Sequence, residues 1–231
     1  MRRCLFVLFG AATLLLESTT VPRAQDVPRG PLYSVGYLDI APGSERDAIE
    51  TLERYRDAIK KDDGFVRFDL LEQMGRPGRF ILLEAWRDQQ ALDARAMSVQ
   101  TIQLLRALKP LAVGAYDQRP YHPLSIAPAS AVVPASAVYG VMHVDTTPTP
   151  TSNAVMLLQQ LAEVGRKEDG NLRFDVIQHL TRTNHFTVIE LWRDQRSADA
   201  HALAANTKKF RDDLLPILGS PYDDRFYKAV E

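Results

Sequence analysis

The sequence is poor in cysteine, and its one cysteine lies close to the start of the chain. Cys4 stands just before a short apolar run, and no other cysteine occurs in the 231 residues. The chain beyond that run therefore cannot form a disulfide within itself, a zinc–thiolate site or a cysteine nucleophile. A mature protein without cysteine suits an oxidising compartment but does not require one.

The sequence also has no excess of charge of either sign. The 28 Lys and Arg residues and the 29 Asp and Glu residues give a formal net charge of −1. Nucleic-acid-binding domains usually carry a basic excess, so we expect no nucleic-acid partner. A Gly-rich phosphate loop, a Ser nucleophile elbow and the paired carboxylates of a glycosidase are absent too. We therefore expect no nucleotide-dependent redox chemistry built into this chain.

The apolar run near the start of the chain is too short to cross a membrane. It extends from Leu5 to Leu16, after two arginines and before small and polar residues. A bilayer span needs about 18–20 apolar residues, whereas this pattern is typical of a secretory signal peptide, here residues 1–24. The cut follows Ala24 or lies nearer Thr20, and an uncleaved anchor is the alternative. We expect a periplasmic or secreted protein without membrane contact after cleavage.

The rest of the sequence presents one pattern twice. Residues 33–122 align with residues 139–228 without a gap. The clearest matches are DGFVRFD (63–69) with DGNLRFD (169–175), and EAWRDQ (84–89) with ELWRDQ (190–195). A gapless match of this length indicates a duplicated domain. We place domain 1 at 31–122, a linker rich in proline and small residues at 123–137, and domain 2 at 138–231.

Each copy is expected to contain four strands and two helical regions. In the first copy the strands are expected at about 33–40, 65–73, within the Glu-x-Trp stretch 80–89 and at 116–121, with helices at about 44–61 and 89–109. In the second copy the corresponding segments are 138–145, 171–179, the stretch 186–195 and 222–227, with helices at 151–167 and 195–215. The order is β-α-β-β-α-β, that of a ferredoxin-like unit.

A ferredoxin-like sheet has helices on one face only, so its other face needs cover. Two such sheets can cover each other. We therefore predict an α+β protein in which two tandem ferredoxin-like domains pack sheet to sheet as an intrachain pseudo-dimeric α+β barrel. In solution it would be a monomer of this kind or a homodimer.

The third strand of each copy carries an unexpected Glu and Trp. Phe186, Glu190 and Trp192 share one face of the strand FTVIELWRDQ because side chains alternate along a strand. Units of this order with Glu-x-Trp-x-Asp on the third strand, followed by a helix with Ala-His, resemble antibiotic biosynthesis monooxygenase (ABM) domains, which pair as dimeric α+β barrels. The matching residues are Glu84, Trp86, Asp88, Glu190, Trp192, Asp194 and Ala200-His201.

This chain departs from the family pattern at three places. The first copy has Arg95 where the second has His201. Some family oxygenases carry an Asn four residues before the Trp, where this chain has Leu82 and Val188. Heme-degrading relatives use an Asn on the first strand, where this chain has Gly36 and Met142.

The resemblance implies a cofactor-independent monooxygenase that acts on a quinol-like or phenolic aromatic small molecule, with O₂ as second substrate. The implied catalytic residues are His201 and Glu190, and the implied substrate-binding residues are Trp192, Trp86, Glu84, His143 and Phe186. No metal and no cofactor are expected, with heme as the alternative cofactor. The alternative function is a non-catalytic exported protein that binds a small hydrophobic ligand or heme, and a third is a structural barrel without a ligand.

Each of these residues also has a purely structural interpretation. Glu84 and Glu190 would pair with Arg67 or Arg173 across the sheet, and the Trp residues would fill the barrel. If residues 195–215 form one helix, His201 lies about 160° around its axis from Leu203, which is expected to be buried. That would make His201 a rim or surface residue, unless it acts as a base or a heme-iron ligand at the barrel mouth.

Four of the five histidines lie in the second copy, and we expect most of them on the surface. They are His143, His179, His185 and His201, in place of Tyr37, Gln73, Arg79 and Arg95. None has the spacing of a metal pair along the chain, and His185 is expected to lie in a solvated turn. His143 is the second candidate for the pocket, but strand parity leaves open whether Tyr37 and His143 or Gly36 and Met142 face inward.

Overall fold

The computed structural model describes residues 30–128, 133–148, 151–221 and 223–230. The expected signal segment, residues 1–24, lies outside the described residues. No helix in the described part of the chain is long and apolar enough to cross a membrane.

The two halves repeat the same order of elements. The first half consists of β1 (Leu32–Asp39), α1 (Glu45–Ile59), β2 (Phe65–Gln73), β3 (Arg79–Trp86), α2 (Gln89–Ala96), α3 (Val99–Leu108) and β4 (Asp117–Ser125). The second half consists of β5 (Val138–Asp145), α4 (Thr151–Gly165), β6 (Asn171–His179), β7 (His185–Trp192), α5 (Gln195–Leu203), α6 (Ala205–Leu214), the 3₁₀ turn η1 (Leu215–Ile217) and β8 (Asp223–Ala229). The duplicated β-α-β-β-α-β order is confirmed.

The second helical region of each half is broken into two helices. In the first half Ser98 separates α2 from α3 and caps α3, because its hydroxyl accepts a hydrogen bond from Thr101 N–H at 3.2 Å. In the second half Ala204 adopts an extended conformation between α5 and α6. The side chains of Asp88 and Asp194 cap α2 and α5, each accepting a backbone N–H at 2.8 Å. The Asp of the Glu-x-Trp-x-Asp pattern therefore starts a helix.

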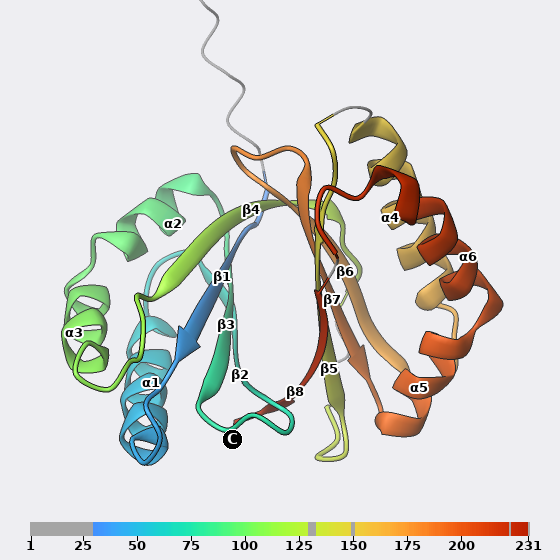
Figure 1. Ribbon diagram of the computed structural model, residues 1–231. Coiled ribbons are helices and arrows are strands. Elements are labelled where there is room, and N and C mark those ends of the chain that lie inside the picture. Colours follow the sequence, from blue (N-terminus) through green and yellow to red (C-terminus); the bar gives the residue numbers. More distant parts are fainter. Residues whose placement is uncertain (1–29, 129–132, 149–150, 222, 231) are drawn as a thin grey trace, which may run out of the picture.

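The eight strands form one closed barrel in the order β1-β3-β2-β8-β5-β7-β6-β4. Each half contributes a four-stranded sheet, and the two sheets join where β2 pairs with β8 and where β4 pairs with β6. β4 continues to Ser125, three residues into the segment expected to be a linker. In Figure 1 helices α1, α2 and α3 cover one side of the barrel and α4, α5 and α6 cover the opposite side. This is the predicted intrachain pseudo-dimer.

Apolar side chains form three layers. One lies between the first sheet and α1–α3, one between the second sheet and α4–α6, and one inside the barrel. Buried residues of the interior include Tyr33, Val35, Ile81, Leu83, Tyr121, Tyr139, Ile177, Ile189, Leu191 and Tyr227. Side chains therefore fill the barrel, as they do in other small barrels.

A charged network joins the two halves across the barrel. Arg173 donates to Asp69 at 3.0 Å and to Asp175 at 2.5 Å, and Arg67 donates to Asp69 at 2.7 Å. Arg67 and Arg173 are thus paired with aspartates of β2 and β6. The expectation that they pair with the glutamates of the Glu-x-Trp strands is wrong.

Candidate functional site

The Glu-x-Trp strands turn their glutamates and indoles away from the barrel interior. Phe186 and Trp192 belong to the layer that packs against α4–α6, whereas Ile189 and Leu191 belong to the interior. On the first strands Met142 packs in the same helix-side layer as Trp192, while Tyr37 packs against the interior. The open question of parity is thereby resolved, and any site built on Glu190 lies between sheet and helices.

Glu190, Trp192 and His201 meet in this layer of the second half. Trp192 Nε1 donates to Glu190 Oε2 at 2.7 Å, and the His201 ring stacks on the indole with centroids 4.8 Å apart. His201 Nε2 lies 3.7 Å from Glu190 Oε1. The structure therefore brings together three of the residues that the sequence singled out, although they come from β7 and α5.

His201 is buried, with 5% of its surface exposed, and Leu203 is 69% exposed. The helical-wheel prediction was wrong for both residues. It assumed one continuous helix over 195–215, but the extended Ala204 interrupts the helix and resets its phase. Phe210 and Leu214, which follow the break, are buried as expected.

Sequence reasoning missed Glu168, which holds the second nitrogen of His201. Glu168 Oε2 lies 2.8 Å from His201 Nδ1, and Glu168 Oε1 accepts a hydrogen bond from Asn206 at 2.9 Å. A carboxylate accepts hydrogen bonds, so this contact places the ring proton on Nδ1 and leaves Nε2 able to accept one. Glu168 lies in the turn after α4, far from His201 along the chain, and no spacing rule connects the two.

A small cavity lies beside these residues and has a volume of about 20 Å³. Its polar walls are Glu190, His201, Thr207, Arg211 and Asp224. Met142, Leu161, Phe210 and Phe226 supply most of its apolar wall. A space of this size holds about one water molecule. Trp192 and Phe186 do not line the cavity, although Trp192 stacks on His201, which does.

The pKa values of two carboxyl groups in this cavity are raised above their ordinary values, although 34% of the Asp224 side chain is exposed. Burial raises the pKa of Glu190, while His201 and the hydrogen bond from Trp192 act against that increase. Burial also raises the pKa of Asp224, against the opposing influence of Arg211. The cavity thus combines an imidazole with two carboxyl groups of raised pKa, which is a set of groups suited to proton transfer.

The first half contains a different arrangement at the same place. Trp86 Nε1 donates to Glu84 Oε2 at 3.0 Å, as in the second half, but Arg95 Nη2 forms an ion pair with Glu84 Oε1. Arg95 and Glu84 are 2% and 1% exposed, and the guanidinium lies over the ring of Tyr55. Tyr116 fills the space beside the glycine of β1, since a Cβ at Gly36 would lie 2.0 Å from Tyr116 Oη. Arginine stays protonated, so this site offers no base.

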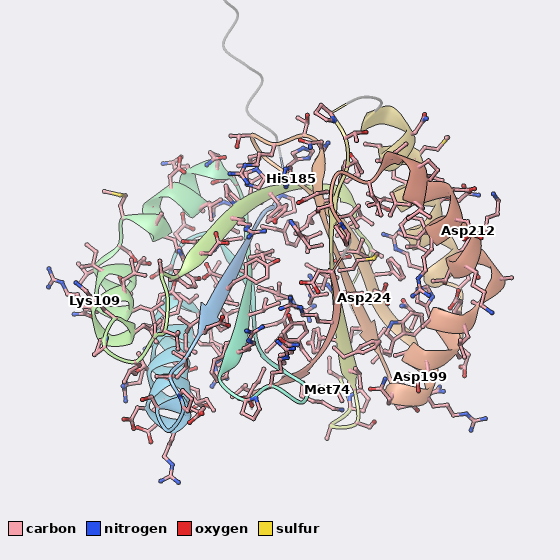
Figure 2. All side chains as sticks on the ribbon, viewed as in Figure 1. Met74, Lys109, His185, Asp199, Asp212 and Asp224 are labelled. Carbon is pink, nitrogen blue, oxygen red and sulfur yellow. The ribbon has the colours of Figure 1, made fainter. Side chains whose placement is uncertain are left out.

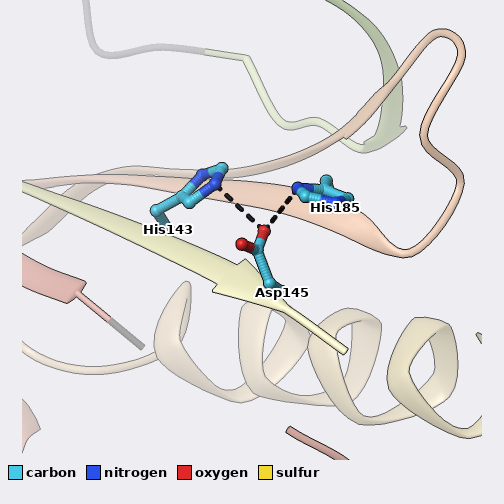
Figure 3. A group of neighbouring side chains, drawn as sticks. All are labelled: His143, Asp145 and His185. Carbon is cyan, nitrogen blue, oxygen red and sulfur yellow. Dashed lines mark ion pairs between the residues drawn. The ribbon is translucent and has the colours of Figure 1, made fainter. Parts of the chain in front are cut away.

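His143 and His185 lie elsewhere, on the barrel side of β5 and at the start of β7. His143 is on the face opposite to Met142, so the structure does not bring it to Glu190. His185 is the first residue of β7, not part of a solvated turn, and its Nδ1 lies 2.6 Å from Asp145 Oδ1. Figure 3 shows His143 and His185 approaching Asp145 from two sides. Spacing along the chain did not reveal this group, because pairing of β5 with β7 forms it.

Comparison with known families identifies the chain. Residues 31–100 and 141–213 match the model of the family described as antibiotic biosynthesis monooxygenase. The chain belongs to the antibiotic biosynthesis monooxygenase family. It carries two copies of the ABM domain, which agrees with the duplicated barrel. No curated protein matches this chain significantly.

Several solved structures share the fold of the tandem ABM chain. A protein of Fusobacterium nucleatum subsp. nucleatum, named as a monooxygenase, is 13% identical with a TM-score of 0.77, over 87% of this chain and 93% of its own. A Lactobacillus acidophilus protein, also named as a monooxygenase, is 14% identical with a TM-score of 0.70, over 87% and 94%. A protein described as anthrone oxidase-like is 13% identical with a TM-score of 0.70, over 88% and 92%. At these identities the likeness concerns the fold.

Proposed function

We propose that this protein is a monooxygenase that oxidises a quinol-like or phenolic aromatic compound with O₂ and without an external cofactor, and that its second half carries the chemistry. The observation that supports this best is the arrangement of Glu168, His201 and Glu190. His201 is oriented by a carboxylate at 2.8 Å on one nitrogen, while its other nitrogen is directed toward Glu190 and the cavity. A base held by a third group in this way is the arrangement that proton abstraction needs.

In the proposed reaction His201 Nε2 takes a proton from the substrate, and Glu168 stabilises the resulting imidazolium. The electron-rich anion then reduces O₂. For an anthrone, one oxygen atom becomes the new ring carbonyl and the other leaves as water, with the two hydrogens of the oxidised carbon. The oxidised carbon loses four electrons in this step and O₂ gains all four, so no external reductant is needed. Burial around His201 would exclude water and strengthen the electrostatic interactions during this step.

The substrate requires more room than the cavity of about 20 Å³ provides. The outer wall is formed by α5 and α6, which meet at the single extended residue Ala204. We propose that α5 and α6 move outward at this junction to admit the aromatic ring, after which the apolar side chains of Met142 and Phe226 would contact it. Trp192 would support the His201 ring from behind.

The alternative, a protein that binds heme or another hydrophobic ligand, fits this site less well. His201 is 5% exposed, and both of its ring nitrogens already face carboxylates. A heme is much larger than an anthrone, so it would need a correspondingly wider opening of α5 and α6. The filled barrel interior is the one observation that favours a structural role without a ligand.

Oxygen uptake by the purified protein tests the proposal. The probes are an anthrone, the class named for one structural neighbour, and a dihydroxynaphthalene, each without added cofactor. We expect uptake by the parent and by Arg95→Ala, and a loss of about 10²–10⁴-fold in His201→Ala. No uptake above the spontaneous rate on any electron-rich phenol would reject the oxygenase. A Soret band on heme titration that His201→Ala shifts would favour the heme-binding alternative.

We also propose that the protein is exported, on the strength of the N-terminal pattern alone. The mature chain would then start between about residues 20 and 30. N-terminal sequencing of protein from the native host checks this, and Met1 retained on cytoplasmic protein would contradict it.

A further inference from the structure

We propose that His143, Asp145 and His185 form a binding site for a divalent first-row transition-metal ion, with Zn²⁺ as the reference ion. Asp145 and His185 are directly opposite each other in the β5–β7 pair, and His143 is two residues from Asp145 on the same face of β5. One ligand atom from each of the three side chains lies within 4.8 Å of the other two. The site is independent of the proposed oxygenase function.

The geometry of the three side chains resembles a coordination shell. Asp145 Oδ1 lies 3.0 Å from His143 Nε2 and 2.6 Å from His185 Nδ1, as the dashed lines in Figure 3 show. This oxygen is buried, and no group in the described residues donates a hydrogen bond to it, so the two rings approach it without hydrogen-bond geometry. Ligands of a tetrahedral Zn²⁺, at about 2.0–2.2 Å from the ion, lie about 3.4 Å apart, so shifts of under about 1 Å would admit the ion.

The donor set determines which ions would bind. Two imidazoles and one carboxylate suit zinc, iron, cobalt or nickel, whereas magnesium and calcium prefer an all-oxygen shell. The three side chains are 21–24% exposed, so an ion can reach them from solvent and keep at least one position for water or a ligand. His143 borders an open groove of about 340 Å³ at this end of the barrel, which would be the route of entry.

A neighbouring arginine opposes the ion and gives the proposal a second test. Arg119 Nη1 lies 3.2 Å from His143 Nε2, while Asp117 accepts two hydrogen bonds from the same guanidinium and Tyr37 stacks against it. A bound cation would have to move this guanidinium aside. Removing its charge should therefore strengthen metal binding.

The first half provides the matched control. There the corresponding residues are Tyr37, Asp39 and Arg79, and Arg79 Nε lies 3.6 Å from Asp39 Oδ1. His185→Arg thus puts into the second half an arrangement that the fold already accommodates. The arginine would still neutralise Asp145, but it cannot bind a metal.

Calorimetric titration of the full chain with Zn²⁺, and visible absorption during titration with Co²⁺, test the site. We expect one Zn²⁺ per chain, an affinity lowered more than about tenfold in His185→Arg and Asp145→Asn, and a raised affinity in Arg119→Gln. His122→Ala, which changes a histidine outside the group, should leave binding unchanged. Zn²⁺ should raise the Tm of the parent but not that of His185→Arg.

Two results would overturn the proposal. One is a parent chain that binds no Zn²⁺ and gives no Co²⁺ absorption band. The other is a folded His185→Arg variant that binds Zn²⁺ as tightly as the parent, since the ion would then be held elsewhere. Thermal unfolding of each variant shows that it is folded before the titrations are compared.

Discussion

The two halves of the chain hold the same carboxylate and indole against different third residues. In the first half Glu84 is paired with the permanently charged Arg95, and Tyr116 occupies the space beside Gly36. In the second half Glu190 faces His201, which can exist in a neutral form, and a cavity of about one water remains. The Trp–Glu hydrogen bond and the Asp helix cap are common to both halves.

This difference separates what the fold needs from what a reaction needs. Elements present in both halves are explained by packing and by satisfied hydrogen bonds, so they say little about chemistry. His201, Glu168 and the small cavity beside Glu190 correspond, in the described part of the first half, to Arg95, Asp62 and the ring of Tyr116, so packing common to both halves does not explain them. They are therefore the part of the molecule in which we expect the function.

The largest effects should come from the two indoles and should be equal in the two halves. Trp86 and Trp192 are both fully buried. Trp86→Ala and Trp192→Ala should each lower the free energy of unfolding by about 3–5 kcal/mol, because each leaves a large cavity in a packed layer. Urea unfolding at pH 7 measures both. A cost below about 1 kcal/mol in either half would show that the layer there is not packed as described.

The glutamates should distinguish the halves. Glu84→Leu leaves the buried charge of Arg95 unpaired, so we expect a loss of about 3–5 kcal/mol, most of it recovered in the double variant Glu84→Leu, Arg95→Leu. Glu190→Leu should cost about 1–3 kcal/mol, since it removes the hydrogen bond from Trp192 but leaves no permanently charged partner. Equal costs for the two single variants would contradict this difference between the halves.

Much of this fold follows from the sequence. Each copy forms a sheet with helices on one face only, so few ways remain to cover the other face besides packing the two sheets together. The β-α-β-β-α-β order and the closure of two sheets on each other were both predicted correctly. Strand parity also showed that Glu190 and Trp192 share a face. It did not show which face packs on helices, because both faces of β7 are apolar and buried.

The site was less predictable because its members meet through tertiary structure. The helical-wheel argument that placed His201 on the surface did not allow for the helix break at Ala204. The break was not predictable because alanine favours helix. Glu168 is one of several acidic residues near the end of α4, and only the packing of α5 against β7 selects it. His143 and His185 become neighbours only through the register of β5 with β7.

A smaller effect is expected for Glu168 and its counterpart. Glu168→Gln weakens the contact with His201 and should cost about 1–2 kcal/mol, since a hydrogen bond to a charged group is lost. Asp62→Asn is the equivalent change in the first half and should stay within about 0.5 kcal/mol, as for most surface substitutions. Chemical unfolding of the two variants side by side measures this. If Asp62→Asn costs more stability than Glu168→Gln, the claim that only the second half uses this acidic residue to hold a buried side chain is contradicted.

The smallest expected effect is a pH dependence that comes from Glu190. Its pKa is raised by burial, with His201, Asp224 and Glu168 as its charged neighbours. The folded state therefore favours the protonated carboxyl, and this stabilisation is complete below the ordinary pKa of 4.5 and is lost as the pH rises through the raised value. Glu190→Gln should accordingly gain stability relative to the parent as the pH increases from about 4 to 7. Parallel stability curves for the two proteins over that range would contradict it.

The most direct test of the account is the variant His201→Arg, which gives the second half the residue of the first. Oxygen uptake is measured on the electron-rich phenol that the parent oxidises fastest, with thermal unfolding as the check on folding. Because arginine pairs with the neighbouring glutamate in the first half, we expect a folded protein whose uptake falls by about 10²–10⁴-fold. A folded His201→Arg variant that consumes oxygen at the parental rate would contradict the claim that the second half carries the proton transfer.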